Sequence, residues 1–289
     1  RYNNIYVFQD GNMRELWIKG DEDYFLQSRI DVKDVLSMNM SYSRLMLAAL
    51  FPQPSPKRVL IVGLGGAILP TFLAHLCPGL RIDIVEIDSK VIEISKKYFF
   101  FKETDLCKVY AEDGRLFIQK RLGKSAYDMV LLDAFKSGSV PYHLKTLQFY
   151  EEINRLLTPN GVVGSNLYGQ SNFLKPHDLQ TFSKVFRQTY LFEDADRIAT
   201  ALIATTQEKP WSLKDFETAA EKLSVDKPDI ISWMEIAAAY KPEPPADVPG
   251  FVFKDDFSRL TFKQSVEKNN LNGPASRPYT IRNTYPAKS

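Results

Sequence analysis

The first thirty residues alternate between apolar and polar side chains in three short bursts. These bursts read NIYVFQDG, MRELWIKG and YFLQSRI, and Asp10-Gly11 between the first two is a strong hairpin signal. The alternation predicts a small antiparallel sheet at the N-terminus. Residues 34–50 then place apolar side chains at helical spacing and close with FPQPSP, which predicts one helix followed by a linker.

From Arg58 onward, apolar strand-like runs alternate with stretches of helical periodicity. The runs lie at 59–62, 82–87, 108–112, 127–133, 161–168 and 197–205. Helices are expected between them, near 67–77, 89–100, 114–121, 143–157 and 176–188. Strands this apolar, separated by helices, indicate an α/β fold with a parallel sheet covered on both faces. Ligands of such sheets bind at the carboxyl ends of the strands.

After Gln207 the alternation stops. SLKDFETAAEKL and PDIISWMEIAAAY look like two helices, KPEPPADVPG is a proline-rich connector, and the last 25 residues look like an extended tail. We therefore predict three parts. They are an N-terminal β-hairpin domain with its helix in 1–50, an α/β domain in 58–206, and C-terminal helices with a tail in 207–289.

The composition narrows the classes of function. A formal charge of +2 predicts no strong attraction to nucleic acid or to an anionic membrane. The histidines are scattered without zinc-ligand spacing, so no metal is expected. Cys77 and Cys107 form no CxxC pair and are expected to be small buried apolar residues. Without a membrane-spanning run or a signal peptide a cytoplasmic location is expected, although a start at Arg1 rather than at methionine leaves the native N-terminus open.

A glycine turn follows the first strand of the α/β part. Gly63, Gly65 and Gly66 let the backbone turn sharply and approach a ligand closely, and the next helix offers free N–H groups. Glu86 ends the following strand, where an acid accepts the hydroxyls of a ribose. The turn alone is equally compatible with plain packing of a strand against a helix. A solvated acid at a strand end is the alternative for Glu86, and the turn before it makes the ribose acceptor the favoured interpretation.

Two further acids follow strand ends. Asp113 and Gly114 open a predicted helix, so Asp113 is either an N-cap or an acceptor for an exocyclic amine such as that of adenine. Asp133 closes the most apolar strand and leads into the polar loop KSGSVP. One glycine turn with three carboxylates favours adenosine over a dinucleotide, because nothing here is arranged to hold a second nucleotide.

With these residues in place, the chain resembles the spermidine synthase (polyamine aminopropyltransferase) family over about residues 5–205. The resemblance rests on LQSRID, VLIVGLGG, IVEID, EDGRLF, YDMVLLDAF and LLTPNGVV. It implies a Rossmann-like sheet of the class I AdoMet-methyltransferase type with a small N-terminal β domain. It also implies a homodimer, a small-molecule amine acceptor, and S-adenosylmethionine or its decarboxylated form as co-substrate, with no metal.

The resemblance assigns a role to each matching residue. Glu86 would hold the ribose and Asp113 the adenine edge, while Asp133 would deprotonate the attacking amine. Gln27 matches a glutamine that lines the site from the N-terminal domain. The glycines complete the predicted nucleoside-binding set: Gly63, Gly65, Gly66 and Gly114.

Two positions depart from the family. Members usually carry an acid in the glycine turn, within GGGDG, and a second acid in D-x-x-D, whereas this chain has Gly66 and Lys136. Both missing acids belong to the part of the site that handles cationic amines. Glu112, Asp255 and Asp256 are candidates for compensating charge.

Three interpretations therefore stay open. They are aminopropyl transfer from decarboxylated S-adenosylmethionine, methyl transfer from S-adenosylmethionine, and a non-catalytic nucleoside-binding module. Methyl transfer accommodates the missing acids better, because an acid-free turn is expected to leave room for the methionine carboxylate near a helix N-terminus.

Overall fold

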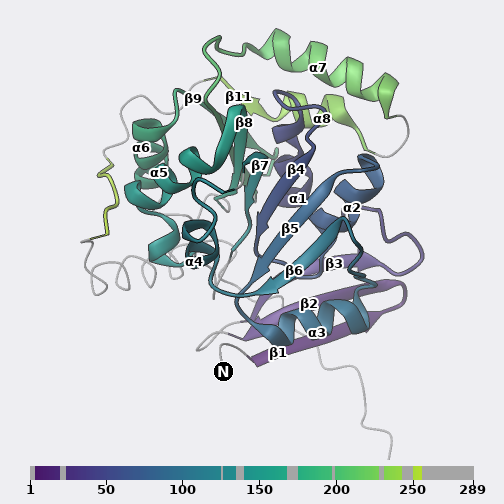
Figure 1. The fold of residues 1–289 in the computed structure, drawn as a ribbon. Helices are drawn as coiled ribbons and strands as arrows, with labels where there is room; N and C mark the ends of the chain where they lie inside the picture. The colour runs from purple at the N-terminus through teal and green to yellow at the C-terminus, as the bar shows by residue number, and fades with distance from the viewer. Residues whose placement is uncertain are drawn as a thin grey trace, which may run out of the picture.

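The computed structural model describes residues 4–19, 24–124, 126–134, 140–167, 175–196, 199–227, 231–242 and 250–255. Within these residues the chain forms a three-stranded antiparallel sheet and an eight-stranded mixed sheet with helices on both faces (Figure 1). The predicted α/β class with a small N-terminal β sheet is confirmed.

The small sheet runs in the order β1 (Asn4–Asp10), β2 (Met13–Lys19), β3 (Tyr24–Asp31). The predicted hairpin joins β1 to β2, and Gly11 takes a φ of +55°, which glycine adopts at little steric cost. Arg14 of β2 donates a hydrogen bond to the carbonyl of Tyr98 at the end of a helix on the large sheet, so the two sheets are in contact.

The large sheet has the order β11-β9-β10-β8-β7-β4-β5-β6, and its five strands from β8 to β6 are parallel. This arrangement brings the carboxyl ends of these strands to one edge, where the ligands of such sheets bind. The five strands match predicted runs: β4 (Arg58–Val62), β5 (Arg81–Glu86), β6 (Cys107–Ala111), β7 (Tyr127–Leu132) and β8 (Leu157–Asn166).

The other end of the sheet is antiparallel, which the sequence pattern did not predict. β10 (Thr200–Thr205) pairs antiparallel with β8 and with β9 (Gln188–Glu193), and β9 pairs antiparallel with β11 (Tyr240–Lys241). The expectation that the run at 197–205 joins the parallel sheet is wrong, and β9 and β11 were missed. The connection from β9 to β10 is too short for the crossover that parallel neighbours need.

Helices cover both faces of the large sheet, as predicted (Figure 1). Alternate residues of β4 point into two separate cores, Val59 and Ile61 into one and Leu60 and Val62 into the other. The first core is closed by α1 (Ser41–Met46), η1 (Leu47–Leu50), α2 (Ile68–Leu76), α3 (Ser89–Tyr98), α7 (Leu213–Asp226) and α8 (Trp233–Ala238). The second is closed by α4 (Gly114–Gln119), η2 (Tyr142–Leu144), α5 (Leu147–Leu156) and α6 (Lys175–Val185).

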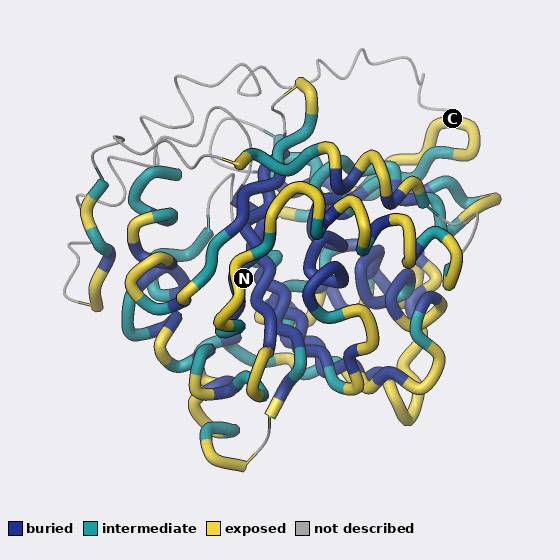
Figure 2. Tube along the Cα trace, turned by 90° about the horizontal axis from the view of Figure 1, so that it is seen from above, coloured by how far each residue is buried: buried dark blue, intermediate teal, exposed yellow. Residues whose placement is uncertain are grey.

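The helix predicted for residues 34–50 begins only at Ser41. The carboxylate of Asp31 accepts from the backbone N of Lys33, and that of Asp34 accepts from the N of Leu36. Such local side-chain bonds offer the backbone an alternative to helix. α1 and η1 then pack against strands β8 and β10 of the large sheet. Figure 2 shows that the buried residues run through the middle of the molecule.

The C-terminal part contains the two predicted helices, and Ser212 and Asp215 form a capping box at the start of α7. Beyond β11, the described segment 250–255 lies against α5 and α6 (Figure 1). Most of the proline-rich connector and the predicted tail lie outside the described residues. Among the helices in the described ranges, none is both long enough and apolar enough to cross a membrane.

Candidate active site

The glycine turn after β4 is packed tightly against the end of β7. Gly63 has a φ of +102°, and a Cβ there would come 2.4 Å from the backbone oxygen of Asp133. Gly65 also has a positive φ, +52°. Glycine is therefore needed at position 63 for the backbone itself, and at position 65 it adopts the left-handed conformation at little steric cost.

Gly66 faces the protein. A Cβ at this position would lie 2.7 Å from Cβ of Ser28 and 2.8 Å from Cδ1 of Phe99. Its backbone N donates to the hydroxyl of Ser28 at 2.8 Å, so β3 of the small sheet holds the turn in place. On this side of the turn Ser28 and Phe99 leave no space for a side chain at position 66, and the expected room for a ligand carboxylate stays a prediction.

Glu86 ends β5 with its carboxylate folded toward the turn. One oxygen accepts from the backbone N of Leu64 at 3.0 Å, and the other accepts from the N of Asp88 at 2.9 Å. Desolvation raises the pKa of Glu86 above its ordinary value, and these backbone bonds oppose that shift. The acid therefore lies beside the glycine turn, which is the position predicted for a ribose acceptor.

Asp113 is an N-cap, and its second oxygen has a further partner. Oδ1 accepts from the backbone N of Arg115 at 3.0 Å and of Leu116 at 3.1 Å. Oδ2 lies 2.8 Å from Nε2 of His143, and this hydrogen bond lowers the pKa of Asp113. Gly114, the next residue, has no room for a side chain, because a Cβ there would lie 2.5 Å from Cγ1 of Val62. Capping therefore occupies one oxygen and leaves Oδ2 as the atom that a nucleobase amine can share with His143.

Asp133 stands at the centre of the edge. Its Oδ1 accepts from the side-chain amide of Asn166 on β8 at 3.0 Å. Desolvation raises its pKa to about 7, the bonds to Asn166 and Tyr42 oppose the rise, and the charge of Glu86 adds to it. An acid with a pKa near neutrality is suited to general-base chemistry.

Tyr42 of α1 connects this acid to the small sheet. Its hydroxyl faces the Asp133 carboxylate, and desolvation followed by that negative charge raises the pKa of Tyr42 well above its ordinary value. The same hydroxyl lies 3.1 Å from the backbone carbonyl of Gln27, which competes with Asp133 for its single proton. The side-chain amide of Gln27 donates to the carbonyl of Phe25 at 3.3 Å, so a direct role for that amide stays a prediction.

Ser28, Tyr42 and Asn166 also lie at this site, and the sequence pattern did not predict them. Ser28 lies within the LQSRID motif next to Gln27, and Asn166 is the last residue of β8. Of these three residues, only Asn166 could have been found from the sequence, because it lies near the end of a predicted strand. Ser28 and Tyr42 come from the small sheet and from α1, and their contacts depend on how these pack against the large sheet.

Two of the acids proposed to compensate for the missing ones pair with cations of their own. Glu112 pairs with Lys120 on the surface, and Asp255 pairs with Arg115 at the start of α4. Lys136 and Asp256 lie outside the described residues.

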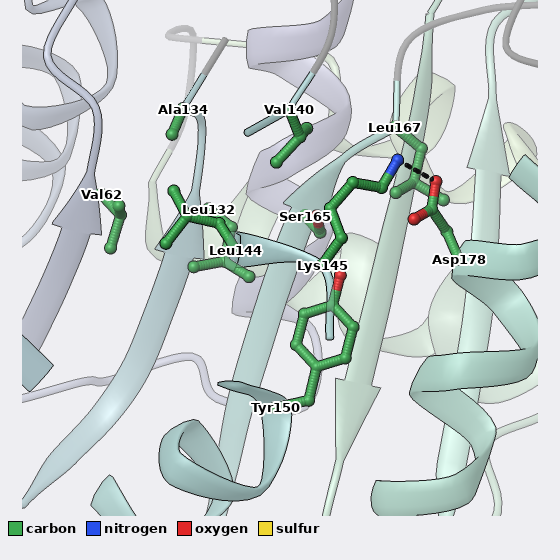
Figure 3. A pocket seen from close by; sticks show the side chains of 10 residues that line it. All are labelled: Val62, Leu132, Ala134, Val140, Leu144, Lys145, Tyr150, Ser165, Leu167 and Asp178. Carbon is green, nitrogen blue, oxygen red and sulfur yellow. Dashed lines mark ion pairs between the residues drawn. The ribbon is translucent and has the colours of Figure 1, made fainter. Parts of the chain in front are cut away.

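A small cavity lies on the opposite face of the same strand ends, under Ala134 and Val140 (Figure 3). Apolar side chains form most of its wall. Nζ of Lys145 and Oδ2 of Asp178 meet at one end, 2.8 Å apart, and both side chains are almost fully buried. Burial and the nearby negative charge of Asp178 raise the pKa of Tyr150, which also lines the cavity. This buried ion pair holds Lys145, which directly follows η2, against Asp178 of α6.

Residues 39–225 match the family model of the spermine/spermidine synthase domain. The chain belongs to this family. Over 229 residues it is 35% identical to a polyamine aminopropyltransferase of Vibrio vulnificus, covering 77% of this chain and 76% of that protein. It is therefore a transferase of the spermidine-synthase type.

Methyltransferases are also among its relatives. The chain is 31% identical over 146 residues to the human eEF1A lysine and N-terminal methyltransferase, covering 47% of this chain but only 21% of that protein. Among solved structures, it is similar to a spermidine synthase in complex with the transition-state analogue AdoDATO, with a TM-score of 0.62 and 20% identity over 83% of this chain and 85% of that one. The predicted methyltransferase-type sheet is confirmed by this likeness in fold.

Proposed function

We propose that this protein transfers an aminopropyl group from decarboxylated S-adenosylmethionine to a small amine. The observation that carries the proposal is Asp133, a desolvated carboxylate with a pKa of about 7 at the edge that also presents the glycine turn and Glu86. The Vibrio vulnificus relative, named a polyamine aminopropyltransferase, supports the same reaction.

The reaction needs an amine freed of its proton. Asp133 takes a proton from the acceptor ammonium, and the nitrogen lone pair then attacks the aminopropyl carbon attached to the sulfonium. The new C–N bond forms as the C–S bond breaks, the electron pair stays on sulfur, and methylthioadenosine leaves. Catalysis in this scheme consists mainly of positioning and of a base whose pKa lies near the operating pH.

The nucleoside would be held by residues already in place. Glu86 would accept from the ribose hydroxyls, and Oδ2 of Asp113 would accept from the adenine amine beside His143. Gly63 and Gly65, both with positive φ, would shape the turn beside the ribose and the sulfonium.

Methyl transfer from S-adenosylmethionine is a second candidate, and one observation favours it. Residue 66 is glycine, so it presents no carboxylate to the ammonium of an aminopropyl donor. An intact methionine group needs no such partner. The same base would then free an amine acceptor for methylation. Asp133 faces Tyr42 and lies near Glu86, and a purely nucleoside-binding role gives no reason for this arrangement.

Calorimetry with S-adenosylmethionine, its decarboxylated form and methylthioadenosine separates these candidates. Aminopropyl transfer requires tighter binding of the decarboxylated donor, and with putrescine it yields methylthioadenosine and a longer polyamine by mass spectrometry. The Asp133→Asn variant is the matched control, because it should bind nucleoside and form no product. Tighter binding of S-adenosylmethionine, with no aminopropyl product from a panel of amines, would favour methyl transfer instead. A homodimer remains a proposal, which light scattering tests.

A further inference from the structure

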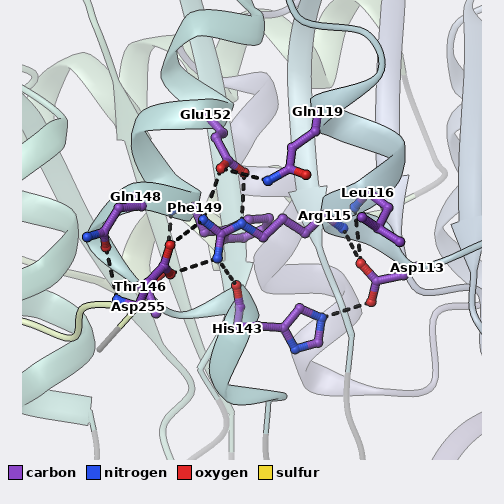
Figure 4. A network of polar contacts seen from close by, with 10 residues as sticks. All are labelled: Asp113, Arg115, Leu116, Gln119, His143, Thr146, Gln148, Phe149, Glu152 and Asp255. Atoms are coloured by element: carbon purple, nitrogen blue, oxygen red, sulfur yellow. Dashed lines mark hydrogen bonds and ion pairs between the residues drawn. The ribbon is translucent and has the colours of Figure 1, made fainter. Parts of the chain in front are cut away.

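Arg115 joins the start of α4 to the C-terminal segment 250–255 (Figure 4). Its guanidinium donates to both carboxylate oxygens of Asp255, at 2.7 and 2.9 Å, and to both oxygens of Glu152, each at 2.9 Å. Only 12% of the Arg115 side chain is exposed. Bidentate pairs of this kind fix both the position and the plane of the guanidinium.

Arg115 also contacts Asp113, whose carboxylate would meet the nucleobase, and His143 beside it. Its backbone N donates to Oδ1 of Asp113, and its side chain donates to the carbonyl of His143 at 3.3 Å. His143 in turn binds Oδ2 of Asp113 at 2.8 Å. Figure 4 shows these contacts as one continuous network from Asp255 to Asp113. Both oxygens of Asp113 are thus oriented by Arg115 or by the residue that Arg115 holds.

The segment that supplies Asp255 is itself anchored. The carbonyl of Phe253 accepts from the N of Leu147 at 2.8 Å, and its N donates to the hydroxyl of Thr181 at 3.1 Å. Phe253 is 1% exposed, and the backbone N of Asp255 donates to the side chain of Gln148 at 3.2 Å. The Asp255 carboxylate therefore has a defined place beside α5 and can act as a fixed partner for Arg115.

We propose that Asp255 is a positioning residue of the nucleoside site, which orients Asp113 toward the nucleobase by holding Arg115. The inference rests on the proposed nucleoside site at Asp113. Without Asp255, only Glu152 would hold the guanidinium of Arg115, on one side. Arg115 would then be a less fixed donor to the carbonyl of His143. Asp255 stays ionised at neutral pH, since its bond to Arg115 lowers its pKa.

Titration of methylthioadenosine into wild type, Asp255→Asn and Glu208→Gln tests this role. Glu208 forms an exposed ion pair with Arg187 away from α4, so its variant controls for the loss of one surface charge. We expect the Kd to rise about three- to tenfold in Asp255→Asn, the scale of a partly exposed charge-assisted contact, and to stay unchanged in Glu208→Gln. In turnover assays the KM for the donor should rise while kcat is kept.

The outcomes distinguish the two proposals. Asp255→Asn with wild-type affinity, even with a lower melting temperature, would show that Asp255 only stabilises the fold and would overturn the positioning role. Wild type that binds no nucleoside would overturn the proposed function together with this inference. Asp255→Glu keeps the charge and should recover part of the lost affinity, which a general folding defect would not explain.

Discussion

The backbone oxygen of Asp133 lies 2.4 Å from the point where a Cβ on Gly63 would stand. The turn expected to hold the nucleoside and the strand end that presents the acid are therefore packed backbone against backbone. No other residue fits at position 63 without moving the acid. A shift of the turn would therefore also shift Asp133, which would couple nucleoside binding to the base if both proposed roles hold.

Asp133→Asn should lower turnover by about 10²–10⁴-fold, the range for loss of a general base. Binding of methylthioadenosine should survive, since the residue keeps its shape and its neighbour Asn166. In wild type the acid must be ionised to act as a base, so kcat/KM should rise as the pH passes about 7. A pH–rate profile with no limb near this value would contradict the assigned base.

Tyr42→Phe should move that limb to higher pH. The bond from Tyr42 lowers the pKa of Asp133, so its loss lets desolvation raise the pKa further. The profile of kcat/KM against pH measures the shift. Tyr98→Phe is the control, because Tyr98 is exposed on α3 and should leave the profile unchanged.

Glu86→Gln should weaken methylthioadenosine binding about tenfold or more. The substitution removes a charge-assisted acceptor, and bonds of that type contribute about 1.5–3 kcal/mol each. Calorimetry gives the affinity, and Glu86→Ala should lose at least as much. Because the carboxylate also accepts from Leu64 and Asp88, a thermal melt of each variant must show that the protein stays folded. Unchanged affinity in folded variants would remove Glu86 from the site.

Gly66→Ala should lower the free energy of unfolding by about 1–3 kcal/mol, as overpacking usually does. The new Cβ would meet Ser28 and Phe99 at less than the normal contact distance, with 2.7 and 2.8 Å available. Denaturant unfolding measures the loss. Gly66→Ala combined with Ser28→Gly should recover part of the stability, and equal losses in the single and double variants would show that Ser28 is not the obstacle.

Lys145→Met should destabilise the fold by about 3–5 kcal/mol, because it leaves the charge of Asp178 buried without its cation. Lys145→Met combined with Asp178→Leu should cost less, since no buried charge then remains. Chemical denaturation of both variants gives the comparison. A double variant less stable than Lys145→Met would show that the pair itself, and not burial of a lone charge, supplies the stability.

Sequence by itself determined the parallel part of the large sheet and most of the residues at its carboxyl edge. The runs that became β4, β5, β6 and β7 are apolar and are followed by Gly63, Glu86, Asp113 and Asp133. Parallel strands end at one edge, so residues that directly follow such strands meet there whatever the rest of the chain does. That regularity is local in sequence, which is why periodicity and strand ends were enough to find it.

Tertiary structure decided the partners of those residues. Ser28 fills the space beside Gly66, Tyr42 faces Asp133, and Arg115 binds Asp255 from 140 positions away. β10 also turned out antiparallel, because its pairing follows from the short connection after β9. Contacts of this kind depend on the angle and distance at which separate elements pack. No local period encodes them, and they set the pKa of Asp133 and the space that is left at the turn.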